Sequence, residues 1–272
     1  MERKLGFIGA GAMAEALIGG VITAGIVAAP DVVVTNRRQR ERLAALEEAW
    51  GVRTVTTKRA LTDEAGVLVL AVKPHDVPVV MRELEGLVDP ARHLIVSVAA
   101  GVTLSYLEGN LPRGTQVVRA MPNTSCRVKE SATAVCFGRW VTPEARNLAL
   151  EIFGAVGEVV VVEEDAIDAV TGLSGSGPAY VYYLLEALVD AGVRMGLSRD
   201  VAGQLARQTL AGAAKMLEDT GEAPARLREM VTSPGGTTMA GITCLEERGF
   251  RQAIMEAVRR ATERSRELTL TD

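Results

Sequence analysis

The sequence has few of the side chains on which several classes of site depend. Its only histidines are His75 and His93, which excludes histidine-rich metal sites and the HExxH zinc motif, and we expect no metal site. The three cysteines, Cys126, Cys136 and Cys244, stand far apart without a CxxC pair, which excludes a zinc ribbon and a disulfide framework. Aromatic residues make up 4% of the chain, which leaves few stacking platforms for single-stranded nucleic acid.

Long apolar runs and a basic charge balance are lacking as well. No stretch approaches about 18 uninterrupted apolar residues, so we expect no membrane-spanning segment. The formal net charge of −4 argues against a nucleic-acid-binding protein, which usually has a basic face. The first 29 residues are similar to a secretory signal peptide, but Glu15 and five glycines between positions 6 and 20 interrupt the apolar stretch. We therefore expect a cytoplasmic protein, which also suits the unpaired cysteines.

The pattern of apolar segments changes once along the 272 residues, a length that predicts about two domains. The predicted strands cover 5–8, 32–35, 53–56, 67–72, 94–99, 117–121, 133–137 and 158–162, and helices are predicted over 13–23, 39–50, 76–87 and 143–153. A strand that is apolar throughout, such as 67–72, needs cover on both faces, which is typical of a parallel sheet between helices. The sequence thus predicts an α/β fold, with a Rossmann-type, doubly wound, mostly parallel sheet in residues 1–162.

Residues 163–272 have no strand pattern and are predicted to form an all-helical domain for substrate binding and dimerisation. The predicted helices cover 166–173, 178–195, 199–218, 225–231, 238–248 and 251–268. The helix 178–195 is apolar on almost every face, and such a helix must be buried on all sides. A domain of this size can hardly surround one helix completely, so we expect a second copy of the chain to cover part of it.

A glycine-rich turn follows the first predicted strand. Gly9, Gly11 and Ala14 form a GxGxxA pattern at the start of a helix. Gly9 permits a tight turn, Gly11 lets a pyrophosphate approach the backbone, and Ala14 is small enough for the helix to pack on the strand. In this position the pattern predicts a dinucleotide site over the helix N-terminus. The alternative is a glycine-rich turn with a purely structural role.

The second predicted strand ends without the acidic residue that usually binds the ribose of NAD. Asn36, Arg37 and Arg38 stand there instead. Two guanidinium groups can bind a 2′-phosphate through charge-assisted hydrogen bonds, although an arginine pair can also be a solvated surface. We predict that NADP(H) is the preferred cofactor and that NAD(H) is possible.

Other candidate residues lie at the ends of the later strands, since ligands of open α/β sheets bind outside the carboxyl ends of the strands. Lys73 and Pro74 follow the strand 67–72, and Ala99 ends the strand 94–99. Met121 and Asn123 stand in the same place after the strand 117–121. We expect these segments to contact the cofactor, although Lys73 by itself can also be an ordinary surface lysine.

A second cluster of candidate residues lies in the helical half. Ser233, Gly235, Gly236, Thr237 and Thr238 stand at the start of a predicted helix. Glycines and hydroxyl groups at a helix N-terminus leave backbone N–H groups free at the positive end of the helix dipole, which favours a carboxylate ligand. The alternative is an ordinary capped helix start.

Several of these segments together resemble the pyrroline-5-carboxylate reductase family. The motifs are FIGAG at 7–11, AVKP at 71–74, AAGVT at 99–103, MPNT at 121–124, GLSGSGPAY at 172–180 and VTSPGGTT at 231–238. The resemblance covers essentially the whole chain. It implies reduction of the cyclic imine Δ1-pyrroline-5-carboxylate to L-proline with NAD(P)H, the last step of proline biosynthesis. It also implies a homo-oligomer that is a dimer at least, and in some members a ring of dimers.

The resemblance assigns roles to individual residues as well. Thr238 is implied to hydrogen-bond the ring nitrogen as the catalytic residue, the loop 233–238 to bind the substrate carboxylate, and Glu164 to lie beside the substrate. Cofactor-contact positions of the family are matched by Ala10, Ala12, Met13, Asn36, Arg38, Val72, Lys73, Ala99 and Met230. Ala12 departs from the family, in which this position is often polar, so phosphate contacts at the turn would come more purely from the backbone.

Two other interpretations stay open at this point. One is another NADP-dependent reductase, acting on a different imine or on a β-hydroxyacid. Such enzymes commonly need a lysine on the first long helix of the second domain, and residues 178–195 contain none. The other is a redox-sensing module that binds NADPH without turnover, although a sensor has no need of a second, carboxylate-binding loop.

Overall fold

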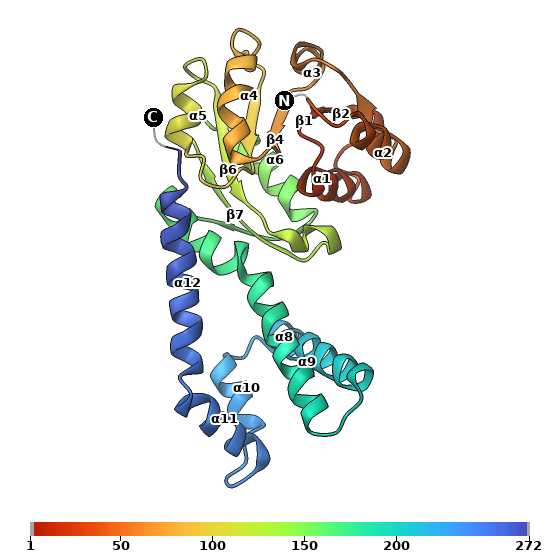
Figure 1. The fold of residues 1–272 in the computed structure, drawn as a ribbon. Coiled ribbons are helices and arrows are strands. Elements are labelled where there is room, and N and C mark those ends of the chain that lie inside the picture. Colours follow the sequence, from red (N-terminus) through yellow and green to blue (C-terminus); the bar gives the residue numbers. More distant parts are fainter. Residues whose placement is uncertain (1–2, 271–272) are drawn as a thin grey trace. The chain divides into compact units, whose positions relative to one another are not determined.

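A computed structural model gives the fold of residues 3–270 (Figure 1). The contacts within the chain group it into two compact units. The sheet unit runs up to Ser176 and also takes in the residues from Arg260 onward, whereas the helical unit is Gly177–Arg259.

One eight-stranded sheet forms the centre of the sheet unit. Its strands, in pairing order, are β3 (Arg53–Thr54), β2 (Val32–Thr35), β1 (Leu5–Ile8), β4 (Val67–Leu70), β5 (Leu94–Ser97), β6 (Gln116–Met121), β7 (Ser131–Phe137) and β8 (Gly157–Val161). The first six run parallel, and Phe7 of β1 lies opposite Val34 and Val69. Strand β7 is antiparallel to β6, and β8 is parallel to β7. The predicted Rossmann-type, mostly parallel sheet is thus confirmed.

Helices cover both faces of this sheet, and every residue of β1, β2, β4 and β5 is buried. The helices of the sheet unit are α1 (Ala12–Thr23), α2 (Arg40–Trp50), α3 (Lys58–Glu64), α4 (Val77–Leu84), α5 (Leu104–Gly109), α6 (Pro143–Gly154) and α7 (Ile167–Val170). In β4, Val67 and Val69 belong to a core that also contains side chains of α1, α2 and α6. Leu68 and Leu70 belong to a second core, with side chains of α3, α4, α5 and α7. The two layers remove both faces of the strand from water.

The structure adds two short helices that the periodicity did not predict. Helices α3 and α5 begin at Thr57 and Thr103, whose hydroxyl oxygens accept hydrogen bonds from backbone N–H groups of the first turn. Each has fewer than two full turns, too short for a 3.6-residue apolar pattern to stand out. The strands predicted over 67–72 and 94–99 also end two residues earlier, because the chain leaves the sheet at Leu70 and Ser97.

The helical unit contains the helices predicted from the sequence. They are α8 (Gly177–Arg194), α9 (Arg199–Thr220), α10 (Pro224–Met230), α11 (Thr237–Glu247) and the first part of α12 (Phe250–Glu267). None of the 18 residues of α8, all within the described part of the chain, is buried. Tyr182 and Tyr183 are 59% and 76% exposed, although they belong to the helix predicted to be covered on all sides. A single chain therefore leaves apolar surface of α8 uncovered.

The short segment before α8 departs from a regular helix. Helix α7 ends at Val170, and residues Thr171–Gly175 form a π-helical turn instead of continuing the predicted helix 166–173. The Nδ2 group of Asn123 donates a 3.0 Å hydrogen bond to the carbonyl of Ser174 in this turn. In a π-helical turn the backbone hydrogen bonds span five residues instead of four. The hydrogen bond from Asn123, which comes from outside the turn, stabilises this irregular backbone.

The predicted division into 1–162 and 163–272 differs from the grouping of contacts, which joins 163–176 and the end of α12 to the sheet unit. Ile167 of α7 is part of the core under α5. Ser265 of α12 donates a 2.6 Å hydrogen bond to Oδ1 of Asp168. These contacts hold both segments in the sheet unit. The division into domains at residue 162 stays a prediction, and it does not coincide with the boundaries of the two compact units.

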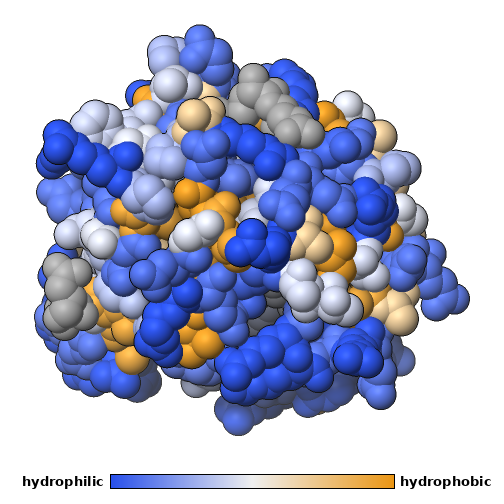
Figure 2. Space-filling model, turned by 90° about the horizontal axis from the view of Figure 1, so that it is seen from above, coloured by the Kyte–Doolittle hydropathy of each residue, from blue (hydrophilic) through white to orange (hydrophobic). Residues whose placement is uncertain are grey.

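Among residues 3–270, no helix is long and apolar enough to cross a membrane. On the face seen in Figure 2, hydrophilic residues predominate and apolar side chains lie in separate groups between them.

Gly20 of α1 offers a test of the packing between α1 and the segment after α6. A Cβ atom at Gly20 would lie 2.2 Å from Cγ1 of Val156. We expect Gly20→Ala to lower the free energy of unfolding by about 1–3 kcal/mol, because overpacking outweighs the gain in helix propensity of about 1 kcal/mol. The matched control is Gly154→Ala at the end of α6, where a Cβ meets no atom within 4 Å and stability should not fall. Urea unfolding measures both, and equal losses would contradict the packing argument.

Candidate active site

The turn between β1 and α1 is held tightly against its neighbours. The backbone N–H of Gly9 donates a 2.9 Å hydrogen bond to the carbonyl of Thr35, at the end of β2. Gly9 has φ +113°, and a Cβ there would lie 2.3 Å from the carbonyl oxygen of Ala71. Only glycine fits this position, because both the left-handed backbone and the close approach exclude a side chain.

The turn leaves the N-terminus of α1 open. Gly11 precedes the helix, and no side chain caps it. A Cβ placed on Gly11 would meet no atom within 4 Å, so there is free space beside Gly11 at the start of the helix. Open N–H groups at the positive end of a helix dipole favour a phosphate group.

Arg42 of α2 fixes the turn from the other side. Its Nε group donates a 3.1 Å hydrogen bond to the carbonyl of Ala10, and its Nη2 group lies 2.7 Å from Oε2 of Glu15 in α1. One guanidinium group thus joins α2, the turn and α1. Arg42 was not predicted as a site residue, because nothing in the helical pattern of 39–50 indicates which arginine contacts the turn.

Most of the predicted cofactor residues of the sheet unit line one cavity at the carboxyl ends of β1, β2 and β4. It has a volume of about 290 Å³. The predicted residues in its lining are Gly9, Ala10, Gly11, Asn36, Arg37, Arg38, Val72 and Lys73. Ala12, Met13, Pro74, Ala99, Met121 and Asn123 belong to the same unit and are not among its lining residues. A shared edge of the sheet therefore brings eight of the predicted residues together.

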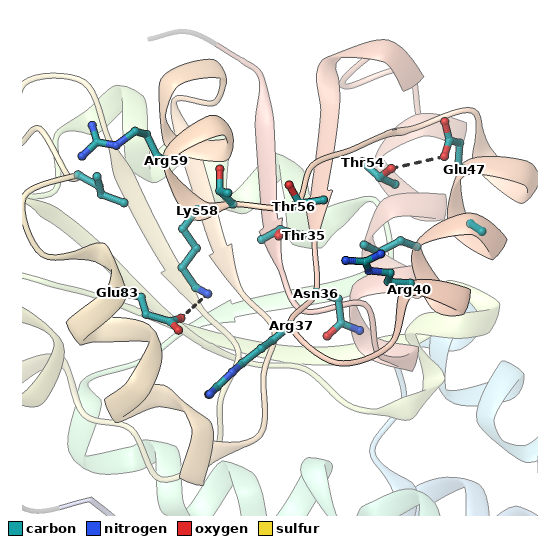
Figure 3. Close-up of a pocket in the computed structure, with 14 residues that line it drawn as sticks. Thr35, Asn36, Arg37, Arg40, Glu47, Thr54, Thr56, Lys58, Arg59 and Glu83 are labelled. Carbon is teal, nitrogen blue, oxygen red and sulfur yellow. Dashed lines mark hydrogen bonds and ion pairs between the residues drawn. The ribbon is translucent and has the colours of Figure 1, made fainter.

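A neighbouring pocket of about 560 Å³ shares Asn36 and Arg37 with this cavity (Figure 3). Lys58, at the start of α3, lines both of them and forms an ion pair with Glu83. Figure 3 shows the side chains of Arg37, Lys58 and Glu83 on the same side of the pocket. The sequence analysis did not select Lys58, since α3 itself was not predicted. Cations of this kind, together with the open end of α1, fit a dinucleotide that carries an additional phosphate.

Asn123 has a structural task beside any contact with a ligand. Its Oδ1 atom accepts a hydrogen bond from the N–H of Ser125, and its Nδ2 group binds the π-helical turn. The side chain is buried, and both of its polar ends are thus engaged. Within the described structure, Asn123 joins the end of β6 to the segment before α8.

Glu164 also forms strong contacts inside the sheet unit. Its Oε1 atom accepts a 2.6 Å hydrogen bond from the backbone N–H of Leu104 and lies 2.8 Å from Nη1 of Arg119. Arg119 stands on β6 and is buried. The carboxylate therefore neutralises a buried cation and binds the start of α5, which is a role that the sequence analysis did not assign to it.

The buried cysteines of this region are poor nucleophiles. Burial raises the pKa of the Cys136 thiol to about 12, and the nearby charge of Glu164 acts in the same direction. Burial raises the pKa of the Cys126 thiol as well. At neutral pH both stay protonated, so neither provides the thiolate that covalent chemistry requires.

The second predicted cluster lies in the helical unit, at the start of α11. Gly235 has φ +69°, and the N–H of Gly236 donates a 3.0 Å hydrogen bond to the carbonyl of Ser233, which closes a tight turn. Gly236 precedes α11, and no side chain caps the first N–H groups of this helix at Thr237 and Thr238. Both threonines are exposed. This end of α11 has the donors that a carboxylate needs. Met230, also exposed, ends α10 in the same unit.

The fold and the glycine turn define the chain as a Rossmann-type dinucleotide-binding protein with an added helical unit. Residues 164–268 match the family model described as pyrroline-5-carboxylate reductase dimerisation. Residues 4–101 match a second model, described as NADP oxidoreductase, coenzyme F420-dependent.

Known relatives extend this result over the whole chain. The pyrroline-5-carboxylate reductase of Methanosarcina acetivorans is 47% identical over 267 residues, which is 98% of each chain. A solved pyrroline-5-carboxylate reductase from Coxiella burnetii superposes with a TM-score of 0.93 at 39% identity and covers 99% of both chains. The enzyme from Plasmodium falciparum, solved with NADP bound, gives a TM-score of 0.87 at 29% identity, also with 99% of each chain covered. The chain belongs to the pyrroline-5-carboxylate reductase family, and its helical part is the dimerisation domain of that family.

Proposed function

We propose that this protein reduces Δ1-pyrroline-5-carboxylate to L-proline with NADPH, as the last step of proline biosynthesis. The observation that carries the proposal is the likeness to named pyrroline-5-carboxylate reductases along both units, at 47% identity for the Methanosarcina relative. The Ser-Pro-Gly-Gly-Thr-Thr segment at the start of α11 supplies the second, substrate-binding feature that a cofactor-binding module alone does not need.

The sheet unit is proposed to bind the cofactor, with NADP(H) preferred and NAD(H) possible. The Plasmodium falciparum relative, solved with NADP, supports this choice. The backbone at Gly9–Met13 binds the diphosphate at the open end of α1. The 2′-phosphate is bound by Arg37, Arg38 and Lys58. The remaining proposed cofactor contacts lie along the carboxyl edge of the sheet: Val72, Lys73, Pro74, Ala99, Met121 and Asn123. Met230 is proposed to contribute a cofactor contact from the helical unit.

The loop 233–238 is proposed to bind the substrate. Its N–H groups and the hydroxyls of Ser233 and Thr237 hold the carboxylate. When bound, NADPH supplies a hydride to the carbon of the C=N bond. The ring nitrogen would take up the electron pair of the C=N bond and so lose its iminium charge. The Thr238 hydroxyl oxygen accepts a hydrogen bond from the iminium N–H and holds the ring in place. A substrate that binds as its iminium brings its own proton from solvent, so no acid from the protein is required.

Glu164 is proposed to lie beside the substrate as well as to bind Arg119. One of its two oxygens, Oε1, accepts both hydrogen bonds described above, which leaves Oε2 as the atom that faces a ligand. Arg119 fixes the position of the carboxylate because a buried guanidinium keeps its partner close.

The working form is proposed to be a homo-oligomer, a dimer at least and in its larger form a ring of dimers. The exposed apolar side chains of α8 support a second copy as the partner, because large exposed apolar patches mark interaction sites. A cytoplasmic location is also proposed, since a reducing compartment suits the three free cysteines.

One assay distinguishes this function from the alternatives. Purified protein should consume NADPH, followed at 340 nm, when pyrroline-5-carboxylate is added, and proline should accumulate in equal amount. A redox-sensing module would bind NADPH and oxidise none of it, and a reductase for another imine or a β-hydroxyacid would turn over only with its own substrate. Either outcome would refute the proposal.

The cofactor preference depends on the cations at the end of β2. We expect Arg37→Ala/Arg38→Ala to raise the KM for NADPH far more than the KM for NADH, because only NADPH carries the 2′-phosphate. Exposed Arg82→Ala on α4, a residue that lines neither pocket, is the control, and both KM values should stay unchanged. If both KM values rise by the same factor, the two arginines do not bind the 2′-phosphate.

The role of Thr238 is tested through its hydroxyl group. A hydrogen bond to a charged group contributes about 1.5–3 kcal/mol, so Thr238→Ala should lower kcat/KM by roughly 10- to 150-fold. Thr238→Ser keeps the hydroxyl and should recover most of the activity. Steady-state kinetics with saturating NADPH measure both variants, and a nearly unchanged kcat/KM for Thr238→Ala would remove this residue from the mechanism.

A further inference from the structure

The segment after α12 lies against the loop that joins β5 to α5. We call residues 268–270 the strap; the chain reaches this position at the end of α12, beside α5 (Figure 1). The backbone N–H of Leu270 donates a 2.7 Å hydrogen bond to the carbonyl of Gly101, a buried residue. A Cβ on Gly101 would lie 2.8 Å from the carbonyl oxygen of Leu268, and Gly101 has φ +69°. The strap therefore packs on this loop at a distance that only glycine permits.

The strap is itself well anchored. Ser265, in the last turns of α12, is buried and donates a 2.6 Å hydrogen bond to Asp168. Leu270 packs against the apolar core to which the loop contributes Ala99 and Val102. All of these residues belong to the sheet unit. The hydrogen bond of Ser265 to Asp168 holds the end of α12 outside the loop, so the strap that follows it can restrain the loop.

The two ends of the loop have other supports. At its start, the N–H of Ala99 donates a 3.3 Å hydrogen bond to Oγ of Ser97. At its end, Glu164 binds the N–H of Leu104 and Thr103 caps α5. In the middle of the loop, the carbonyl of Gly101 accepts its hydrogen bond from the N–H of Leu270. The strap thus supplies the contact that fixes the middle of the loop.

The strand order indicates which part of the cofactor this loop meets. The strands run β2, β1, β4, β5 along the sheet. Arg37 and Arg38, the cations proposed to bind the 2′-phosphate, follow β2, and the turn at Gly9, proposed to bind the diphosphate, follows β1. An extended dinucleotide therefore places its other end, the nicotinamide, beyond β4 and β5. This step rests on the proposed function and on the binding of ligands at the carboxyl edge of such sheets.

We propose that Leu270 is a positioning residue of the reductase, and that the strap fixes Ala99–Gly101 under the nicotinamide ring. Hydride transfer requires reacting atoms about 3–3.5 Å apart, and a misplacement of about 1 Å can cost roughly 100-fold in rate. The affinity for NADPH comes mainly from the turn at Gly9 and the cations beside it. Loss of the strap contact should therefore slow the hydride step and leave cofactor binding nearly unchanged.

Three variants of the full chain separate the parts of this contact. Leu270→Pro removes the N–H donor, Leu270→Ala keeps the donor and removes the packing, and Leu270→Ile is the conservative control. A chain that stops at Glu267 removes the whole strap. Arg264→Ala changes an exposed ion pair of the same helix and should leave the activity unchanged.

Two kinds of measurement are needed. In the cofactor-free protein, hydrogen–deuterium exchange of the peptide that covers 98–104 should be faster in Leu270→Pro and in the shortened chain. In the assay, kcat should fall roughly 10- to 100-fold. The isotope effect with NADPH deuterated at the transferred position should rise above the wild-type value, while the Kd for NADPH stays within about twofold. Leu270→Ile should behave as the wild type, and Leu270→Ala should fall between.

The outcomes can be told apart. Unchanged exchange and unchanged kcat in Leu270→Pro and the shortened chain would overturn the proposal. A lower Tm together with weaker NADPH binding and an unchanged isotope effect would also overturn it, because the strap would then be merely structural. If the wild-type protein does not reduce pyrroline-5-carboxylate, the proposed function fails, and with it the assigned role of the loop, whatever the exchange result.

Discussion

The close approach of Gly9 to the end of β4 is the constraint on which the candidate cofactor site depends. The turn binds the carbonyl of Thr35 on one side and touches that of Ala71 on the other, so its path is determined by two neighbouring strands. This path leaves the N-terminus of α1 open, with the space in front of Gly11 free. Arg42 then holds the outer side of the turn. The cavity at this edge of the sheet depends on these contacts, because much of its lining comes from the segments that follow β1, β2 and β4.

The parts of the fold that the sequence predicted are those with a local pattern. The fully apolar run at 67–72 predicted a strand covered on both faces, and the glycines at 9 and 11 predicted the turn, because each depends on only a few consecutive residues. Helices α3 and α5 had no such pattern, since each is short and begins at a single threonine. Lys58 was missed for that reason, and with it a cation of the candidate cofactor site.

Long-range contacts were out of reach for a different reason. The pairs Glu164–Arg119 and Leu270–Gly101 join residues that are far apart in the chain, and no spacing rule connects them. Glu164 was selected through the family resemblance alone, yet its contacts in the structure include a buried arginine and the start of α5. The predicted substrate-binding residues at 233–238 span a turn and the first two positions of α11. The turn contains Gly235 with φ +69°, and this glycine was visible in the sequence.

The helical unit has a topological property with its own consequence. Residues 177–259 form an insertion, because the chain leaves the sheet unit after Ser176 and returns to it within α12 at Arg260. The return occurs inside one continuous helix rather than through a loose linker. The insertion is therefore joined to the sheet unit by two covalent connections, one at each of its ends. A protease that cuts once within the insertion would accordingly leave both fragments bound to the same sheet.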